Sequence, residues 1–193
     1  VATSADGSVI VAAAKDGRIY NSTDSGISWS ARDAIRKWVA VTSTALGDKF
    51  FAAVEDGSIY SSNDFGVNWT QGSAPNKTWS AISSSSDGSI LGATVIQGKI
   101  FISTDGGANW AEKNSDKNWR NIALTSNGEK MIAVVGSGQI YTSTDTGQNW
   151  TARDSARNWR ALTLSSGGSL AFASDFGKKL YRSTNAGLTW TAL

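Results

Sequence analysis

A cation followed two residues later by tryptophan occurs four times in this sequence, and these pairs are its best candidates for binding a ligand. They are Arg36 and Trp38, Lys77 and Trp79, Lys117 and Trp119, and Arg157 and Trp159. A flat indole can stack on the apolar face of a sugar, while a neighbouring Arg or Lys binds hydroxyls or an anionic group. Four similar sites would add avidity. The alternative is structural: each ring fills a gap between neighbouring units of the fold, with the cation lying over it.

Composition excludes several other kinds of chemistry. The chain has 193 residues, no Cys and no His, so it has no thiol nucleophile, no thiolate metal site and no imidazole base. Its net charge of +2 gives no reason to expect a nucleic-acid partner. No stretch has the length and apolarity of a membrane span. We therefore expect no cofactor, no metal, no nucleic acid and no membrane insertion, and the Cys-free composition fits several compartments.

The carboxylates do not form an evident catalytic set. Glu55 and Asp56 are the only adjacent pair, at a predicted hairpin turn, and Glu112 and Glu129 are isolated. A catalytic residue normally breaks the symmetry of a repeat, because one reaction needs one asymmetric site, and this chain breaks its symmetry very little. We expect a protein without enzymatic activity.

An eight-residue motif, Ser-x-Asp-x-Gly-x-x-Trp, organises the chain. Its tryptophans fall at 29, 69, 110, 150 and 190, in steps of 40 or 41 residues, which marks a repeat architecture. The motif positions are Ser22, Asp24, Gly26 and Trp29; Ser62, Asp64, Gly66 and Trp69; Ser103, Asp105, Gly107 and Trp110; Ser143, Asp145, Gly147 and Trp150; and Ser183, Asn185, Gly187 and Trp190.

Each repeat consists of short β-rich runs separated by turns such as Asn127-Gly128 and Ser137-Gly138. Four antiparallel strands per 40 residues predict a blade of a β-propeller. We expect an all-β, five-bladed propeller in a single domain of residues 1–193. The approximate blades are 1–33, 34–73, 74–114, 115–154 and 155–193.

The eight-residue motif resembles the Asp-box, or BNR repeat, over the whole chain. Asp-box propellers include sialidases, other glycoside hydrolases, propeller lectins and photosystem II assembly factors. The resemblance implies a self-satisfied turn between the third and fourth strands of each blade, and it is unspecific for function. A calcium site is the rival interpretation of the Asp, but the motif lacks the further carboxylates that such a loop needs.

The five units could close a ring with both termini at one seam. Val1 aligns with Val41, Ile82, Ile122 and Leu162, and Leu193 lies just after the last motif, so about eight positions are missing, all within one connection. A monomer is favoured. An arc of a larger propeller, or assembly with a second chain, is the alternative.

Three functions are compatible with these residues. The first is a non-catalytic, lectin-like propeller that binds glycans through the four cation–tryptophan pairs. The second is a protein-interaction or assembly scaffold resembling the photosystem II assembly factors and using the same basic residues. The third is an inactive piece of a larger glycosidase or repeat protein. Exposure of the four indoles separates the first two, since a sugar site needs an accessible ring face.

Overall fold

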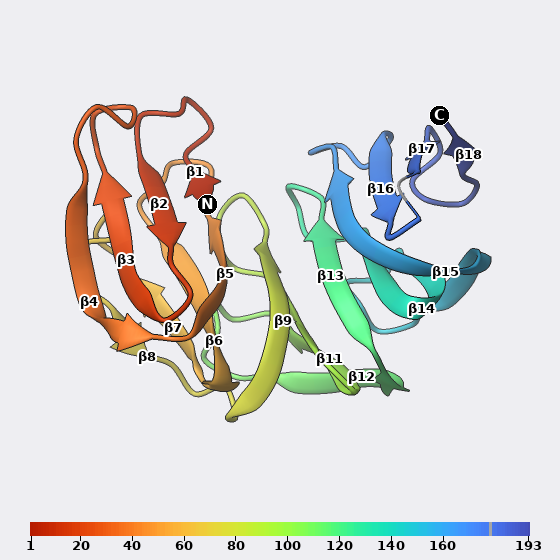
Figure 1. Cartoon of the computed structure of the whole chain (residues 1–193), viewed down its shortest axis with the longest axis horizontal. Coiled ribbons are helices and arrows are strands. Elements are labelled where there is room, and N and C mark those ends of the chain that lie inside the picture. The colour runs from red at the N-terminus through yellow and green to blue at the C-terminus, as the bar shows by residue number, and fades with distance from the viewer. Residues whose placement is uncertain (178) are drawn as a thin grey trace.

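The computed structural model describes residues 1–177 and 179–193 as an all-β chain of eighteen strands (Figure 1). The strands form successive antiparallel meanders, and their pairing divides the chain into five units of four strand segments each. The described residues include no helix with the length and apolarity needed to cross a membrane.

The first three units each have four separate strands. The first unit holds β1 (Ala2–Thr3), β2 (Ile10–Ala13), β3 (Gly17–Ser22) and β4 (Ser30–Arg36). The second unit holds β5 (Trp38–Ser43), β6 (Phe50–Gly57), β7 (Ile59–Ser62) and β8 (Thr70–Gln71). The third unit holds β9 (Lys77–Ser84), β10 (Leu91–Val95), β11 (Gly98–Ser103) and β12 (Ala111–Lys117).

The last two units contain two long strands, each of which changes its pairing partner at an irregularity in the register. One of these strands runs from the fourth unit into the fifth. The fourth unit is built from β13 (Trp119–Leu124), from β14 (Met131–Ser143), which supplies two strand segments, and from the first half of β15 (Thr151–Leu164). The fifth unit takes the second half of β15 and adds β16 (Ala171–Asp175), β17 (Leu180–Ser183) and β18 (Thr191–Ala192). A short pairing of β6 with β9 likewise joins the second and third units, so the five units lie in three sheets.

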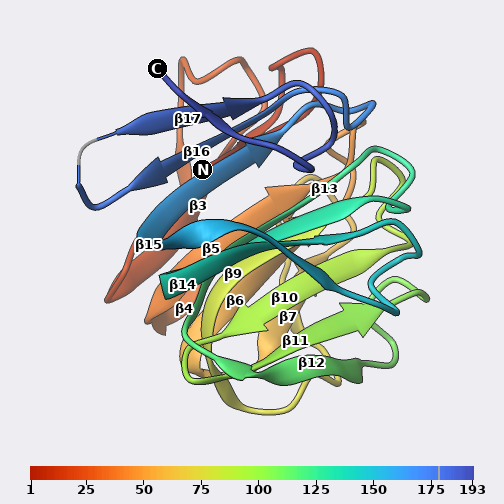
Figure 2. The same ribbon diagram turned by 90° about the vertical axis from the view of Figure 1, so that its right-hand side faces the viewer.

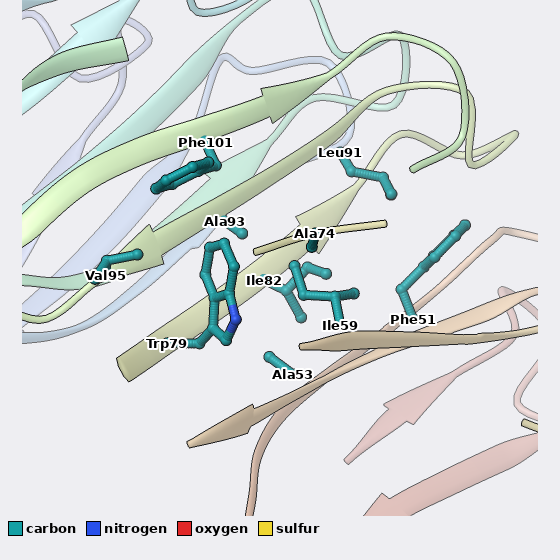
Figure 3. Packing of buried hydrophobic residues seen from close by; sticks show 10 residues of the cluster. All are labelled: Phe51, Ala53, Ile59, Ala74, Trp79, Ile82, Leu91, Ala93, Val95 and Phe101. Atoms are coloured by element: carbon teal, nitrogen blue, oxygen red, sulfur yellow. The ribbon is translucent and has the colours of Figure 1, made fainter. Parts of the chain in front are cut away.

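The second strand of each inner unit is buried on both faces. Phe50–Ala53, Leu91–Val95 and Met131–Val135 are buried at every residue, which is typical of a strand packed between two layers. Four apolar clusters lie between neighbouring units, each formed by opposite faces of two successive units. In Figure 3, Ala53 and Ile59 of the second unit lie near Trp79 of the third, and Phe51 lies beyond Ile59 towards Leu91.

The eight-residue turns satisfy their own polar groups. In residues 143–150 the Ser143 hydroxyl donates to Asp145 Oδ1 at 2.7 Å and accepts from Gly147 N at 2.9 Å. Asp145 Oδ1 accepts from Asn149 N at 2.9 Å, and Trp150 Nε1 donates to Gly147 O at 3.0 Å. Asn185 keeps the same role in the last copy, where its Oδ1 accepts from Thr189 N at 3.0 Å. The turns therefore have the structural role that the sequence indicated.

Acidification is expected to weaken the fold through turn carboxylates. Hydrogen bonds donated by Ser side chains and turn amides lower the pKa of Asp6, Asp24, Asp87 and Asp145 to about 2 from 3.8. A lowered folded pKa contributes stability that is fully present above about pH 4 and is lost as the pH falls towards 2. Urea unfolding midpoints should therefore fall across this window. Asp145→Asn, which resembles the natural Asn185, should fall less steeply; a flat profile would contradict this role of the carboxylates.

The five units form an open arc. The first turns of successive units are linked by backbone hydrogen bonds, from Ala5 N to Ala45 O (2.8 Å), Ala45 N to Ser86 O (2.7 Å), Ser86 N to Ser126 O (2.8 Å) and Ser126 N to Ser166 O (2.9 Å). Within the described strands, none of the first unit pairs with one of the fifth, and Figure 1 shows the two units apart. Turned by 90°, β14 and β15 lie between β16–β17 and β11–β12 (Figure 2). The expected closure into a five-unit ring is not seen, because the rotation between neighbouring units does not complete a circle in five steps.

Candidate binding surface

The four cation–tryptophan pairs lie on one side of the arc, where the chain passes from each unit to the next. We call this side the connection end. Here the connections between units, ending at residues 38, 79, 119 and 159, run beside the turns that follow the second strands. Strand pairing sets each cation opposite a turn glycine: Arg36 opposite Gly17, Lys77 opposite Gly57, Lys117 opposite Gly98, and Arg157 opposite Gly138. The structure thus brings the four cations to one end, as their repeat spacing predicted.

The four tryptophans of these pairs are buried. The exposed fractions are 1% for Trp38 and Trp79 and 0% for Trp119 and Trp159. No face is left for a sugar ring, so the expectation that these indoles stack on a glycan is wrong. The alternative interpretation describes the observed geometry: each ring fills the space between two units.

Each buried indole belongs to a triad of aromatic rings. In the fourth unit, Trp119 meets Tyr141 edge-on at 5.2 Å between ring centroids and lies 6.5 Å from Trp150. The same arrangement joins Trp38 with Tyr60 and Trp69, Trp79 with Phe101 and Trp110, and Trp159 with Tyr181 and Trp190. Offset and edge-on ring pairs stabilise a core beyond the area that they bury.

The cations cover the second ring of each triad. The distances to the ring centroid are 4.5 Å from Arg36 Cζ to Tyr60, 6.0 Å from Lys77 Nζ to Phe101, 5.4 Å from Lys117 Nζ to Tyr141, and 4.8 Å from Arg157 Cζ to Tyr181. The sequence predicted that the cations lie over tryptophan, which holds for Arg36 over Trp38 (5.9 Å) and Arg157 over Trp159 (5.7 Å), but it did not predict the closer Tyr or Phe. A signal was present, because the Tyr or Phe follows its cation at the same spacing in all four copies.

The four cations differ in their ion pairs. Arg36 lies 3.3 Å from Asp33, and Arg157 lies 3.6 Å from Asp154. Among the described residues, Lys77 and Lys117 form no ion pair. Within that part of the chain, the ammonium groups of Lys77 and Lys117 are therefore open to a ligand, whereas the guanidinium groups of Arg36 and Arg157 already have carboxylate partners.

Two pockets at equivalent positions open beside these two lysines. One, of about 450 Å³, lies in the fourth unit and is lined by Lys117, Asn118, Gln139 and Tyr141 with the turn 135–138 and Ala156. Lys117 is the only charged residue among the described residues of its lining. The other, of about 500 Å³, lies in the third unit and includes Lys77, Lys99 and Phe101 together with Asp56, Glu112 and Asp116. The first pocket is cationic and the second has mixed charge.

In the larger pocket, a lysine and a glutamate of the lining form an ion pair with each other. Lys99 Nζ and Glu112 Oε2 are 2.7 Å apart. This contact lowers the pKa of Glu112 and raises the pKa of Lys99. Both groups are ionised at neutral pH and largely neutralise each other, which leaves the pocket polar.

Unpaired polar atoms lie beside the cationic pocket. Asn118 Nδ2 donates weakly to Gly136 O at 3.5 Å, while Asn118 Oδ1 and Arg120 Nε are shielded from solvent and have no hydrogen-bond partner among the described residues. A β-carbon on Gly136 would come within 2.8 Å of Arg120 Nε, which shows how closely these groups approach the backbone. A buried donor and acceptor without partners are costly unless a water or ligand satisfies them.

The connection end and the opposite side of the arc differ in charge. Cations outnumber carboxylates at the connection end. In addition to the four cations of the cation–tryptophan pairs and those of the connecting strands, this side holds Lys15, Arg18, Lys37, Arg120, Arg160 and Lys179. Carboxylates outnumber cations on the opposite side of the arc, which holds Asp6, Asp24, Asp48, Asp64, Asp87, Asp105, Glu129 and Asp145. The connection end is therefore the one that favours an anionic ligand.

The carboxylates nearest to one another in the sequence have other partners. Glu55 lies 2.7 Å from Lys15 Nζ, and Asp56 Oδ1 accepts a hydrogen bond from Thr78 at 2.6 Å. In the described part of the chain, no cluster of three or more His, Cys, Asp or Glu side chains is placed to hold a metal ion.

One family model matches part of the sequence. The family model of the DUF6242 beta propeller domain matches residues 39–125, which cover the second and third units and the start of the fourth. No curated protein matches the sequence. The match supports a β-propeller architecture.

Comparison of structures extends this architecture to the whole chain. An ancestral GH74 enzyme superposes with a TM-score of 0.77 at 19% identity, over 99% of this chain and 30% of the enzyme. The GH74 enzyme of Niastella koreensis gives 0.74 at 19% identity, over 98% of this chain and 30% of the enzyme. YCF48 bound to a D1 peptide gives 0.52 at 14% identity, over 98% of this chain and 79% of YCF48. The chain thus spans about 30% of the length of these GH74 enzymes, and the likeness is one of fold.

Proposed function

We propose that this chain is a non-catalytic β-propeller of the Asp-box type, with its five units as blades, which binds an acidic peptide segment of a protein partner at its connection end. The observation that carries this function is the pocket of the fourth unit. Lys117 lies over Tyr141 in that pocket. Among the residues that the structure describes, it has no carboxylate partner and is the only charged residue of the lining. A carboxylate in this pocket would meet an ammonium group whose position is set by the ring beneath it.

The groups beside the pocket suit a peptide. Asn118 and Gln139 line the pocket with amide groups, which can donate to a peptide C=O and accept from a peptide N–H. The further cations at this end provide electrostatic attraction for a chain that bears several carboxylates. The peptide on YCF48, a protein of similar fold, makes a peptide ligand a reasonable first choice.

Binding without catalysis fits the state of the carboxylates. Glu55 and Glu112 are held in ion pairs with Lys15 and Lys99, and ionised, paired carboxylates are poor general acids. The repeated pockets differ mainly in charge, which suits selection among ligands more than a single reaction.

A peptide-binding assay tests this function. Binding of a fluorescein-labelled Glu-Gly repeat peptide is measured by fluorescence anisotropy, with a Gln-Gly peptide as the neutral probe. Lys117→Gln should weaken binding of the acidic peptide by about tenfold or more, because it removes a charge-assisted hydrogen bond. Added salt should weaken binding to the wild-type chain.

Lys130→Gln is the matched control. Lys130 lies in the first turn of the fourth unit, which also supplies Tyr141 to the pocket; it is half-buried like Lys117 but lies on the opposite side of the arc from the connection end. It should bind the acidic peptide as the wild type does. Equal losses in the two variants, or equal binding of the acidic and neutral peptides, would refute the proposed site.

Glycan binding is the second candidate, and the pocket of the third unit favours it. Asn76, Gln97 and Asp56 line this pocket near Phe101 and can bond to hydroxyl groups, although no indole face is available there. A panel of neutral and anionic oligosaccharides tests this alternative. Binding that is lost in Gln97→Ala and kept in Lys117→Gln would identify a glycan site and displace the peptide.

A further inference from the structure

The first and last units each leave one sheet face uncovered. We call the face that packs on the preceding unit the leading face, and the opposite one the trailing face. In the second strand of the last unit, Ala171 and Ala173 of the leading face are buried, while Phe172 and Ser174 of the trailing face are half-buried. In the first unit the trailing Val11 is buried and the leading Ile10 and Ala12 are half-buried. Both open faces are unlike the corresponding faces inside the arc.

The trailing face of the last unit is exposed, and it is apolar around Leu180, with Arg182 at its margin. Leu180 is 44% exposed, whereas its equivalents Ile19, Ile59, Ile100 and Ile140 are at most 3% exposed. A shallow depression of about 160 Å³ beside it is lined by Ala161, Leu162, Thr163, Phe172, Ala173, Ser174 and Leu180. None of these residues is charged, so the face has the character of a packing surface.

The leading face of the first unit is the complementary surface. Tyr20 is 39% exposed, whereas its equivalents Tyr60, Phe101 and Tyr181 are at most 8% exposed and Tyr141 is half-buried. Gly26 has the left-handed conformation of the other turn glycines, with φ of +87°, and only Ile10 and Trp29 of its own unit lie near it. Inside the arc, this glycine position receives a side chain of the preceding unit: Val11 at Gly66, Ile102 at Gly147 and Ile132 at Gly187.

The internal interfaces show how the two open faces would fit. Between the first two units, Val11 and Ile19 pack against Phe50, Ala52 and Tyr60. Between the last two units, Ile132 and Ile140 pack against Ala171, Ala173 and Tyr181. The open faces present the same positions: Phe172 and Leu180 on one side, and Ile10, Ala12 and Tyr20 on the other.

We propose that the trailing face of the last unit binds the leading face of the first unit of a second copy of this chain, so that copies join head to tail. Phe172 then seats against Gly26 of the partner copy, as Ile132 seats against Gly187 within the arc. Both faces belong to this chain and repeat a contact that it already makes four times, which favours a second copy over an unrelated partner. An interface of this kind joins two different surfaces and closes only if the rotation allows it.

Two hydrogen-bonding groups support the same register. The N–H groups of Ala45, Ser86 and Ser126 each donate to the next first turn, while the Ser166 N–H has no such acceptor among the described residues. The Ala5 carbonyl of the partner copy occupies the equivalent acceptor position. Arg182 stands where Asn21 donates to Phe65 O at 3.2 Å in the first interface, so the partner's Ser25 carbonyl is its expected acceptor.

Self-association of the 193-residue chain tests the proposal. Sedimentation velocity and native mass spectrometry should show a mass above 20.3 kDa that rises with concentration. Leu180→Asp blocks the trailing face and Tyr20→Asp blocks the leading face, and each should weaken association by about tenfold or more, because a carboxylate is then desolvated without a partner. Leu46→Asp adds the same charge at a residue that is 77% exposed in a turn, and it should associate as the wild type does.

Mixing the two blocked variants separates this contact from any other. Tyr20→Asp keeps a trailing face and Leu180→Asp keeps a leading face, so their mixture should form a 1:1 pair although each alone is monomeric. A monomeric wild type at every soluble concentration would overturn the proposal. So would a mixture without pairs, or an equal loss in Leu46→Asp. Circular dichroism of each variant establishes that it is folded.

Discussion

Replacing Trp119 by alanine should lower the free energy of unfolding by about 3 to 5 kcal/mol, the usual cost of truncating a buried tryptophan. Trp119 is 0% exposed and packs between Tyr141 and Trp150 in the cluster between the third and fourth units. The truncation would leave a cavity between two sheets whose other side chains are already packed in place. Urea unfolding followed by far-ultraviolet circular dichroism measures the effect.

Trp150→Ala provides the comparison. Trp150 is half-buried and mainly covers its own turn, where Nε1 donates to Gly147 O at 3.0 Å. Its loss should therefore be smaller than that of Trp119. A loss below about 1 kcal/mol for Trp119→Ala would show that this ring is not part of the core, since even modest cavities cost more. It would also reopen the ring as a surface for a ligand.

The repeat made the fold of each unit predictable. The fixed spacing of the eight-residue turns indicated the number of strand segments per unit. The repeated turn glycines, which pair with the cations, indicated that the cations lie together at the connection end; these glycines are Gly17, Gly57, Gly98 and Gly138. The arc was not predictable in the same way. Closure depends on the rotation between units, and that rotation is set by how side chains such as Ile132 and Ala171 interlock rather than by their spacing in the sequence.

The repeat spacing predicted that the four cations lie together, but it did not predict their closest ring contacts. Cation and indole are two residues apart in the same connection, which suggests that they act together, but the indole turns inward to the neighbouring unit while the cation lies over Tyr60, Phe101, Tyr141 or Tyr181. Nor did the repeat show that the four cations are unequal. That difference arises from single residues, such as Asp33 and Asp154, that break the repeat beside Arg36 and Arg157.

Under the proposed function, this inequality places the binding site in the middle of the arc. Lys77 and Lys117 differ from the outer arginines both in lacking an ion pair within the described part of the chain and in opening to a pocket. An arginine with a carboxylate three residues away keeps its connection in place, and a free lysine is the better ligand group. The two open faces belong to the first and last units, away from the middle of the arc. Association of copies through these faces would therefore leave the middle pockets accessible.

Gly147→Ala should destabilise the fold through two separate effects, strain in its own turn and crowding of the preceding unit. Gly147 has φ of +76°, where a side chain costs about 1 to 2 kcal/mol in strain. An added β-carbon would also come within 2.8 Å of Ile102 Cγ1 and 3.2 Å of Met131 Sδ, both of which are buried. Overpacking of this kind typically costs a further 1 to 3 kcal/mol or so. Chemical denaturation of the purified variant gives the total.

Gly7→Ala isolates the second contribution. Gly7 has a similar φ of +73°, but nothing lies within 4 Å of an added β-carbon, so only the strain remains. The difference between the two variants is then the cost of crowding at the contact between the third and fourth units. Equal losses would mean that the units separate slightly at little cost, and the interfaces would be softer than their buried side chains indicate. A larger loss for Gly147→Ala would mean that this turn glycine is required twice, once for its own backbone and once to receive the neighbouring unit.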